Sequence, residues 1–184
     1  MIVPDNLFLQ VKAIYDKGSI PWFFAFHIQK VAAYAEEIST REKTSPRLPV
    51  AAALLHDLAR AWGTWEEPML MDETLKKSRE ILSRNNFSIK EISEILSAIQ
   101  THGCRKNSPK TITGKILSTS DALAHLITRF YFELPVYDKS FNKNFREWAL
   151  EKISRDYNRK IRFQKDKSRA AKYYKSLKFL LEAK

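Results

Sequence analysis

Five ionisable side chains of the types that bind metal ions interrupt apolar, helix-like stretches of this 184-residue chain. They are His27 in FFAFHIQKV, the adjacent His56 and Asp57 in AAALLHDLAR, His102 after SAIQT, and Asp121 in KILSTSDALAHL. Burying an imidazole or a carboxylate without a partner costs free energy, and the cost is greatest for the carboxylate. A shared cation removes this cost, because it attracts carboxylate oxygens and binds neutral imidazole nitrogens. The pattern therefore predicts one metal site built from four helices.

Each of these residues also has a simpler explanation when it is considered alone. A single histidine on an apolar face is more often a hydrogen-bonded core residue than a ligand, and an aspartate near a helix start is often a cap. Four separate helices that all direct such groups inward are harder to explain independently. His125, four residues after Asp121, falls on the same helical face, but the predicted ligand set is complete without it.

The helices that must position these residues follow from apolar side chains at helical spacing. Leu, Ala, Lys, Glu and Ile dominate, only 4 residues are Gly, and no alternating stretch is long enough to predict a strand. We therefore expect an all-α bundle, with Asp72 and Ser88 as N-caps and a break at Pro135. The predicted helices cover 5–16, Pro21 to about 40, 50–61, 72–86, 89–102 and about 114–127, and two basic helices follow.

In order, spacing and helical setting, the five positions resemble the HD-domain metal-dependent phosphohydrolase superfamily. The resemblance covers roughly residues 20–130. It implies an HD-domain-like helical bundle in which one divalent ion is bound by His27, His56, Asp57 and Asp121. Mn, Fe, Co, Ni, Zn and Mg all suit such nitrogen and oxygen ligands, and the sequence does not select among them.

His102 matches a position that in relatives either binds a second metal or contacts phosphate. Relatives with two metals have a further histidine early in the helix after the HD pair, where this chain reads DETLKKSREIL, with Thr74 near that place. We therefore expect one metal ion, with His102 outside its ligand set.

The resemblance also implies a phosphomonoesterase or phosphodiesterase that attacks the phosphate ester of a nucleotide or small phosphorylated metabolite with a metal-activated water. Asp57 is expected to orient that water, and His102 or Glu66 to act as the general acid. Four cations are candidates for binding the phosphate, although each is equally well explained as a solvated surface charge: Arg60, Arg105, Lys106 and Lys115.

Positive charge is concentrated at one end of the chain. The net charge is +11, and residues 139–184 contain 15 Lys or Arg against 5 Asp or Glu. We therefore expect an HD-type metal-binding domain over 1–135 and a basic C-terminal helical extension over 136–184. Interleaved aromatic residues leave open a different function, that of a helical module which binds RNA or another polyanion and keeps a structural metal. Their helical spacing favours burial instead, with the cations facing solvent or concentrating anionic substrates.

The remaining features bear on the compartment. Cys104 is the only cysteine, no basic stretch precedes an apolar one at the start, and no apolar run reaches the roughly 20 residues that span a bilayer. We expect a cytoplasmic protein that does not associate with membranes and whose partner is a small phosphorylated substrate. Binding of nucleic acid is expected only under the alternative function. The sequence does not indicate the oligomeric state.

Overall fold

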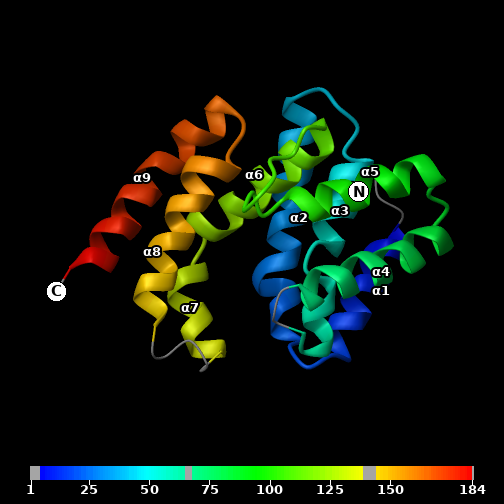
Figure 1. Cartoon of the computed structure of the whole chain (residues 1–184), viewed down its shortest axis with the longest axis horizontal. Coiled ribbons are helices and arrows are strands. Elements are labelled where there is room, and N and C mark those ends of the chain that lie inside the picture. Colours follow the sequence, from blue (N-terminus) through cyan, green and yellow to red (C-terminus); the bar gives the residue numbers. More distant parts are fainter. Residues whose placement is uncertain (1–4, 65–67, 139–143, 184) are drawn as a thin grey trace.

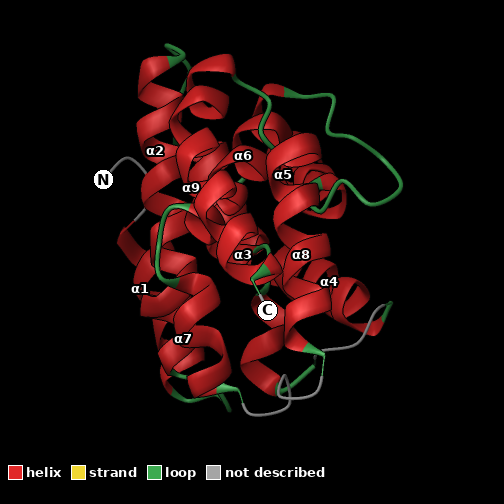
Figure 2. Cartoon of the chain, turned by 90° about the vertical axis from the view of Figure 1, so that its left-hand side faces the viewer, coloured by secondary structure: helices red, strands yellow, loops and turns green. Residues whose placement is uncertain are grey.

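The computed structural model describes residues 5–64, 68–138 and 144–183, and every regular element in these ranges is a helix (Figure 2). The all-α prediction is confirmed. None of the helices in these ranges combines the length and the apolar character needed to cross a membrane. The elements are α1 (Asp5–Asp16), η1 (Phe24–Ile28), α2 (Gln29–Arg41), α3 (Arg47–Leu55), η2 (Leu58–Trp62), α4 (Met69–Arg84), α5 (Ile89–Thr101), α6 (Ile112–Leu126), α7 (Phe130–Tyr137), α8 (Phe145–Arg155), η4 (Asp156–Lys160) and α9 (Gln164–Glu182).

Helix α6 is the centre of the molecule. It contacts α2, α3 and α5 on one side, and α7, η4 and α9 on the other (Figure 1). Almost every residue from Thr113 to Leu126 is buried. Small side chains let neighbours approach closely: a Cβ on Gly114 would lie 2.7 Å from the Cβ of Pro109 and 3.6 Å from the Cα of Ala98. Apart from Lys115, which is exposed, the polar side chains from Thr113 to His125 on α6 therefore lie in the interior.

Three sequence-based expectations about helix boundaries are wrong. The helix expected over 50–61 ends at Leu55, and a turn at His56 and Asp57 leads into the short 3-10 helix η2. Helix α4 begins at Met69 after Pro68, so Asp72 lies within it instead of capping it, because the fixed backbone of proline starts the first turn. Pro135 does not break the chain but lies inside α7.

Helix α7 tolerates Pro135 because its apolar side chains pack into the core. Phe130, Tyr131 and Leu134 are buried, and this burial outweighs the one backbone hydrogen bond that a proline removes. The cap predicted at Ser88 is confirmed. Its hydroxyl accepts from the backbone N–H of Glu91, and the Glu91 side chain accepts from the backbone N–H of Ser88.

Candidate metal centre

The turn at His56 and Asp57 is what presents both side chains to the interior. His56 ends α3, and Asp57 leaves the helical conformation with φ −119° and ψ 24°. The buried Tyr15 on α1 donates its hydroxyl to the carbonyl oxygen of Asp57 at 2.9 Å. From α4, the Thr74 hydroxyl accepts the backbone N–H of Ala59 at 3.2 Å. The turn is therefore fixed by two other helices.

Hydrogen bonds to the backbone orient two of the imidazoles. The Nδ1–H of His56 donates to the carbonyl oxygen of Ala53 at 2.8 Å, and that of His102, which follows α5, donates to Ile99 at 2.6 Å. A carbonyl oxygen only accepts, so the proton is on Nδ1 and the Nε2 lone pair of each ring is left for another partner. This arrangement is typical of histidines that bind metals.

All four histidines of the chain surround one carboxylate, that of Asp121 on α6. Its Oδ1 lies 3.1 Å from Nε2 of His27, 3.4 Å from Nε2 of His125 and 3.7 Å from Nε2 of His56. The Nε2 of His102 lies 4.0 Å from the other oxygen, Oδ2. His27 comes from the π-helical segment η1, a rare conformation that is frequent at functional sites.

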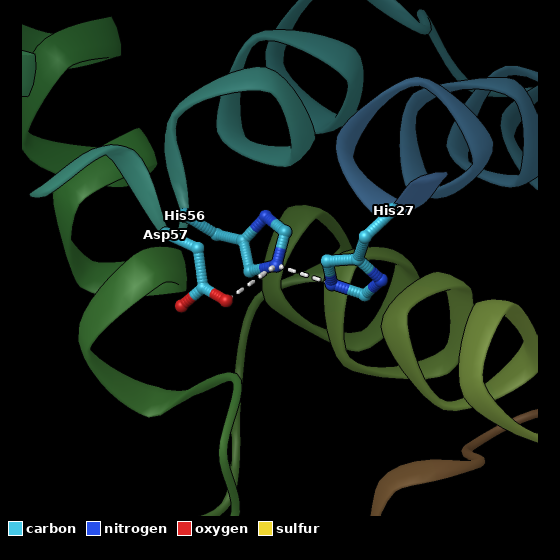
Figure 3. A group of neighbouring side chains, drawn as sticks. All are labelled: His27, His56 and Asp57. Carbon is cyan, nitrogen blue, oxygen red and sulfur yellow. Dashed lines mark hydrogen bonds and ion pairs between the residues drawn. The ribbon is translucent and has the colours of Figure 1, made fainter. Parts of the chain in front are cut away.

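The predicted ligands are brought together. The Nε2 atoms of His27 and His56 are 3.2 Å apart, and Oδ2 of Asp57 is 3.8 Å from Nε2 of His56 (Figure 3). Within the part of the chain that the structure describes, three overlapping sets could hold a metal, each with ligand atoms within 4.8 Å: His27, His56 and Asp57; His27, Asp121 and His125; and His56, His102 and Asp121. His125 thus lies closer to the centre than the sequence suggested.

These donors fit a divalent cation. Oδ1 of Asp121 is buried and accepts no hydrogen bond, although three imidazole nitrogens lie near it. Nε2 of His56, which carries a lone pair, faces Nε2 of His27 at 3.2 Å. Neutral imidazole nitrogens and a carboxylate oxygen that face one another in this way are the ligand types of Mn, Fe, Co, Ni and Zn sites.

Charges around the centre favour ligands in their metal-binding forms. Burial raises the pKa of the Asp57 carboxyl, but Arg60, whose Nε donates to Oδ2 at 2.8 Å, and His56 outweigh burial and hold it well below its usual range. Burial, together with the nearby His56, lowers the pKa of His102 to about 4. At neutral pH the carboxylate is therefore ionised and this imidazole is neutral.

One side of the centre is accessible to solvent. The side chains of His102, Asp57 and Arg60 are 12, 15 and 22 % exposed. Arg60 thus lies beside Asp57 at the edge of the centre. The other predicted phosphate-binding side chains, those of Arg105, Lys106 and Lys115, are fully at the surface, and Glu66 lies outside the described residues.

The opposite side is closed by residues that sequence reasoning missed. Lys160, at the end of the π-helical η4, contacts Oδ2 of Asp121, and its Nζ lies 3.4 Å from Oδ1 of Asp156. Oδ2 of Asp156 accepts from the Tyr131 hydroxyl at 3.0 Å and lies 3.1 Å from Nδ1 of His125. Burial lowers the pKa of Lys160, and Asp121 and Asp156 more than reverse this, so that it is raised. In sequence, Asp156 and Lys160 resemble an ordinary ion pair of residues four apart on a helix surface. Nothing in the neighbouring sequence indicates that this pair is buried.

Comparison with known proteins assigns the fold. A family model described as the HD domain matches residues 24–126, which include all four histidines. The chain belongs to the HD-domain family. A solved structure, that of a predicted HD superfamily hydrolase from an uncultured Thermotogales bacterium, is 25% identical to this HD-domain protein. The alignment covers 81% of this chain and 84% of that one, with a TM-score of 0.60. No curated protein matches.

Proposed function

We propose that this HD-domain protein is a metal-dependent phosphohydrolase that acts on a phosphate ester of a nucleotide or another small phosphorylated metabolite. The observation that carries the proposal is the convergence of four imidazoles on the carboxylate of Asp121, three of them around its buried, unsatisfied Oδ1. The family match and the name of the Thermotogales relative support the assignment to hydrolases.

His27, His56, Asp57 and Asp121 would hold the ion, and His125 is a further candidate. A bound divalent ion would supply a Lewis acid that activates water and offsets the charge of a phosphate oxygen. Asp57 lies on the accessible side with its carboxylate held by Arg60, so it is placed to accept a hydrogen bond from the attacking water and orient it. The hydrogen bond from Nδ1 of His102 to the carbonyl oxygen of Ile99 fixes this ring with its Nε2 4.0 Å from Asp121. Because Nε2 of the neutral ring carries no proton, His102 would have to take up a proton before it could serve as the general acid.

The accessible side also sets where phosphate approaches. Arg60 contacts Asp57 on this side and keeps partial exposure to solvent, so among the proposed phosphate-binding cations it is the one that borders the centre. Arg105, Lys106 and Lys115 would attract and hold the more distant part of an anionic substrate. Glu66 stays an alternative general acid.

The alternative function, binding of RNA or another polyanion, has less support. Stacking on bases requires exposed aromatic faces, but Phe145, Trp148 and Phe163 pack against the core. Tyr157 and Tyr174 stack on each other, with ring centroids 4.4 Å apart and planes 5° from parallel. The aromatic residues of the basic helices thus serve mainly to pack these helices against each other and against the core.

The decisive experiment is metal-dependent turnover. The protein is stripped with a chelator, reconstituted separately with Mn, Fe, Co, Ni, Zn or Mg, and assayed on an aryl phosphate, a bis-aryl phosphate and a nucleotide panel. We expect turnover only with metal, and its loss in Asp57→Asn but not in the matched control Asp72→Asn, which removes an exposed carboxylate of α4. Absence of metal-stimulated turnover, together with salt-dependent RNA binding, would instead favour the polyanion-binding module.

A further inference from the structure

Besides Arg60, a second cationic side chain lies at the candidate metal centre, that of Lys160. Its ammonium contacts Oδ2 of Asp121, and its side chain is only 3 % exposed. A buried lysine is rare unless it is paired, and Asp156, with its Oδ1 at 3.4 Å, completes the pairing. Lys160 lies outside residues 24–126, so the extension supplies a group that the matched HD domain does not contain.

The backbone around Lys160 is tied directly to α6. The carbonyl oxygen of Lys160 accepts from the hydroxyls of Ser118 and Thr119 at 3.0 and 3.4 Å. The hydroxyl of Thr119 in turn accepts the backbone N–H of Arg162 at 3.0 Å. Because Ser118 and Thr119 lie three and two residues before Asp121 on α6, the same helical turn positions both the carboxylate and the backbone that carries the ammonium. The contact is therefore a built feature of the fold.

The two oxygens of Asp121 have different partners. Oδ2 contacts Lys160, whereas Oδ1 faces the imidazoles of His27, His56 and His125. Two-metal hydrolases keep their ions about 3.5–4 Å apart and need carboxylate oxygens for both. His102, which a second ion held by His56, His102 and Asp121 would use, lies 4.0 Å from Oδ2, the oxygen that Lys160 already contacts.

We propose that Lys160 takes the place of a second metal ion and thereby limits this centre to one. The inference rests on the metal site of the proposed function and names the residue that sets its stoichiometry. The balance of charge supports the proposal, because the carboxylates at the centre already have cationic partners. Asp57 faces Arg60, Asp121 faces Lys160, and Asp156 faces Lys152 and Lys160. A second divalent ion beside a buried ammonium would be repelled strongly, because little water screens the charges there.

Metal stoichiometry tests the proposal without reference to turnover. Wild type, Lys160→Met and Lys152→Met are stripped, reconstituted with excess Mn²⁺ and desalted, and bound manganese is measured by mass spectrometry and by electron paramagnetic resonance. We expect one ion per chain in wild type and two in Lys160→Met, with the spectrum of a coupled pair. Lys152→Met is the matched control, since Lys152 lies 3.5 Å from Asp156 and also borders the centre, and it should hold one ion.

Two manganese ions in wild type, or one in folded Lys160→Met, would overturn the proposal. Should Lys160→Met fail to fold, Lys160→Gln keeps a donor without the charge and should bind two ions, whereas Lys160→Arg should bind one. A wild-type count of two ions overturns the proposal even if no variant folds. Wild type that binds one ion but shows no turnover contradicts only the proposed function, and wild type that binds none contradicts both.

Discussion

The two sides of the candidate metal centre, which meet at Asp121, differ in their contact with solvent. On the accessible side, Asp57, Arg60 and His102 retain partial contact with solvent, so substrate and water can approach them. On the closed side, His125, Asp156 and Lys160 are almost completely buried and hydrogen-bonded or ion-paired to one another. One carboxylate is therefore shared between a region suited to chemistry and a region suited to holding that carboxylate in place.

The two sides also come from different parts of the chain. The accessible side is built from the segment that matches the HD domain, and most of the closed side from α8 and η4 beyond it (Figure 1). If this division is real, changes on the accessible side should affect activity more than stability, and changes on the closed side the reverse. A change at Asp121 itself should affect both.

Asp121→Asn should have the largest effect, because it removes the group that both sides share. The neutral amide no longer compensates the buried ammonium of Lys160, and loss of one partner of a buried ion pair costs about 3–5 kcal/mol. We expect metal content and turnover to fall to background and the unfolding midpoint in urea to decrease. Retention of a full metal complement in this variant would show that Asp121 is not a ligand.

Asp156→Asn should lower stability while leaving the metal in place. Asp156 is fully buried and faces Lys152, Lys160 and His125, so its neutralisation leaves two ammonium groups less compensated. We expect a loss of about 3 kcal/mol in the free energy of unfolding, measured by urea denaturation. Bound metal should stay at one ion per chain. Loss of the metal with unchanged stability would reverse the assignment of the two sides.

Acid should destabilise the metal-free protein through its buried imidazoles. Burial lowers the pKa of His102 to about 4 and that of His125 to about 3, from 6.5. Between pH 6.5 and 4 the unfolded chain therefore binds protons that the folded chain excludes, so stability falls as the pH falls. From pH 7 to pH 5 each histidine should remove on the order of 2 kcal/mol from the free energy of unfolding.

The measurement is urea denaturation with chelator present at both pH values. His102→Gln cannot take up the proton in the unfolded state, so its stability should depend less on pH than that of wild type. An equal pH dependence in wild type and His102→Gln would show that this imidazole is not held neutral by the fold.

The sequence predicted which side chains gather at the candidate site better than it predicted the backbone around them. His27, His56, Asp57, His102 and Asp121 stand out because an ionisable residue within an apolar helix needs an explanation. The turn that ends α3 at His56 carries no such signal, because Ala and Leu continue the helical pattern up to it and tertiary contacts from α1 and α4 decide the backbone there.

The contact of Lys160 with Asp121 was beyond sequence reasoning for a different reason. It joins residues 39 apart in the chain, and a lysine in a segment rich in cations gives no sign that it is the buried one. The domain boundary at residue 135 and the phosphate-binding roles of Arg105, Lys106 and Lys115 stay predictions.

Ser88→Ala should have the smallest effect and separates general stability from both sides of the centre. It removes a hydroxyl that caps the first turn of α5, and loss of such a cap costs about 1 kcal/mol. His102 follows the other end of the same helix, so fraying at Ser88 should not reach it. We expect a slightly lower urea midpoint with unchanged metal content and turnover. If metal content fell as well, metal binding would depend on the stability of α5 as a whole. The effects of Asp121→Asn and Asp156→Asn would then need correction for that dependence before the two sides could be compared.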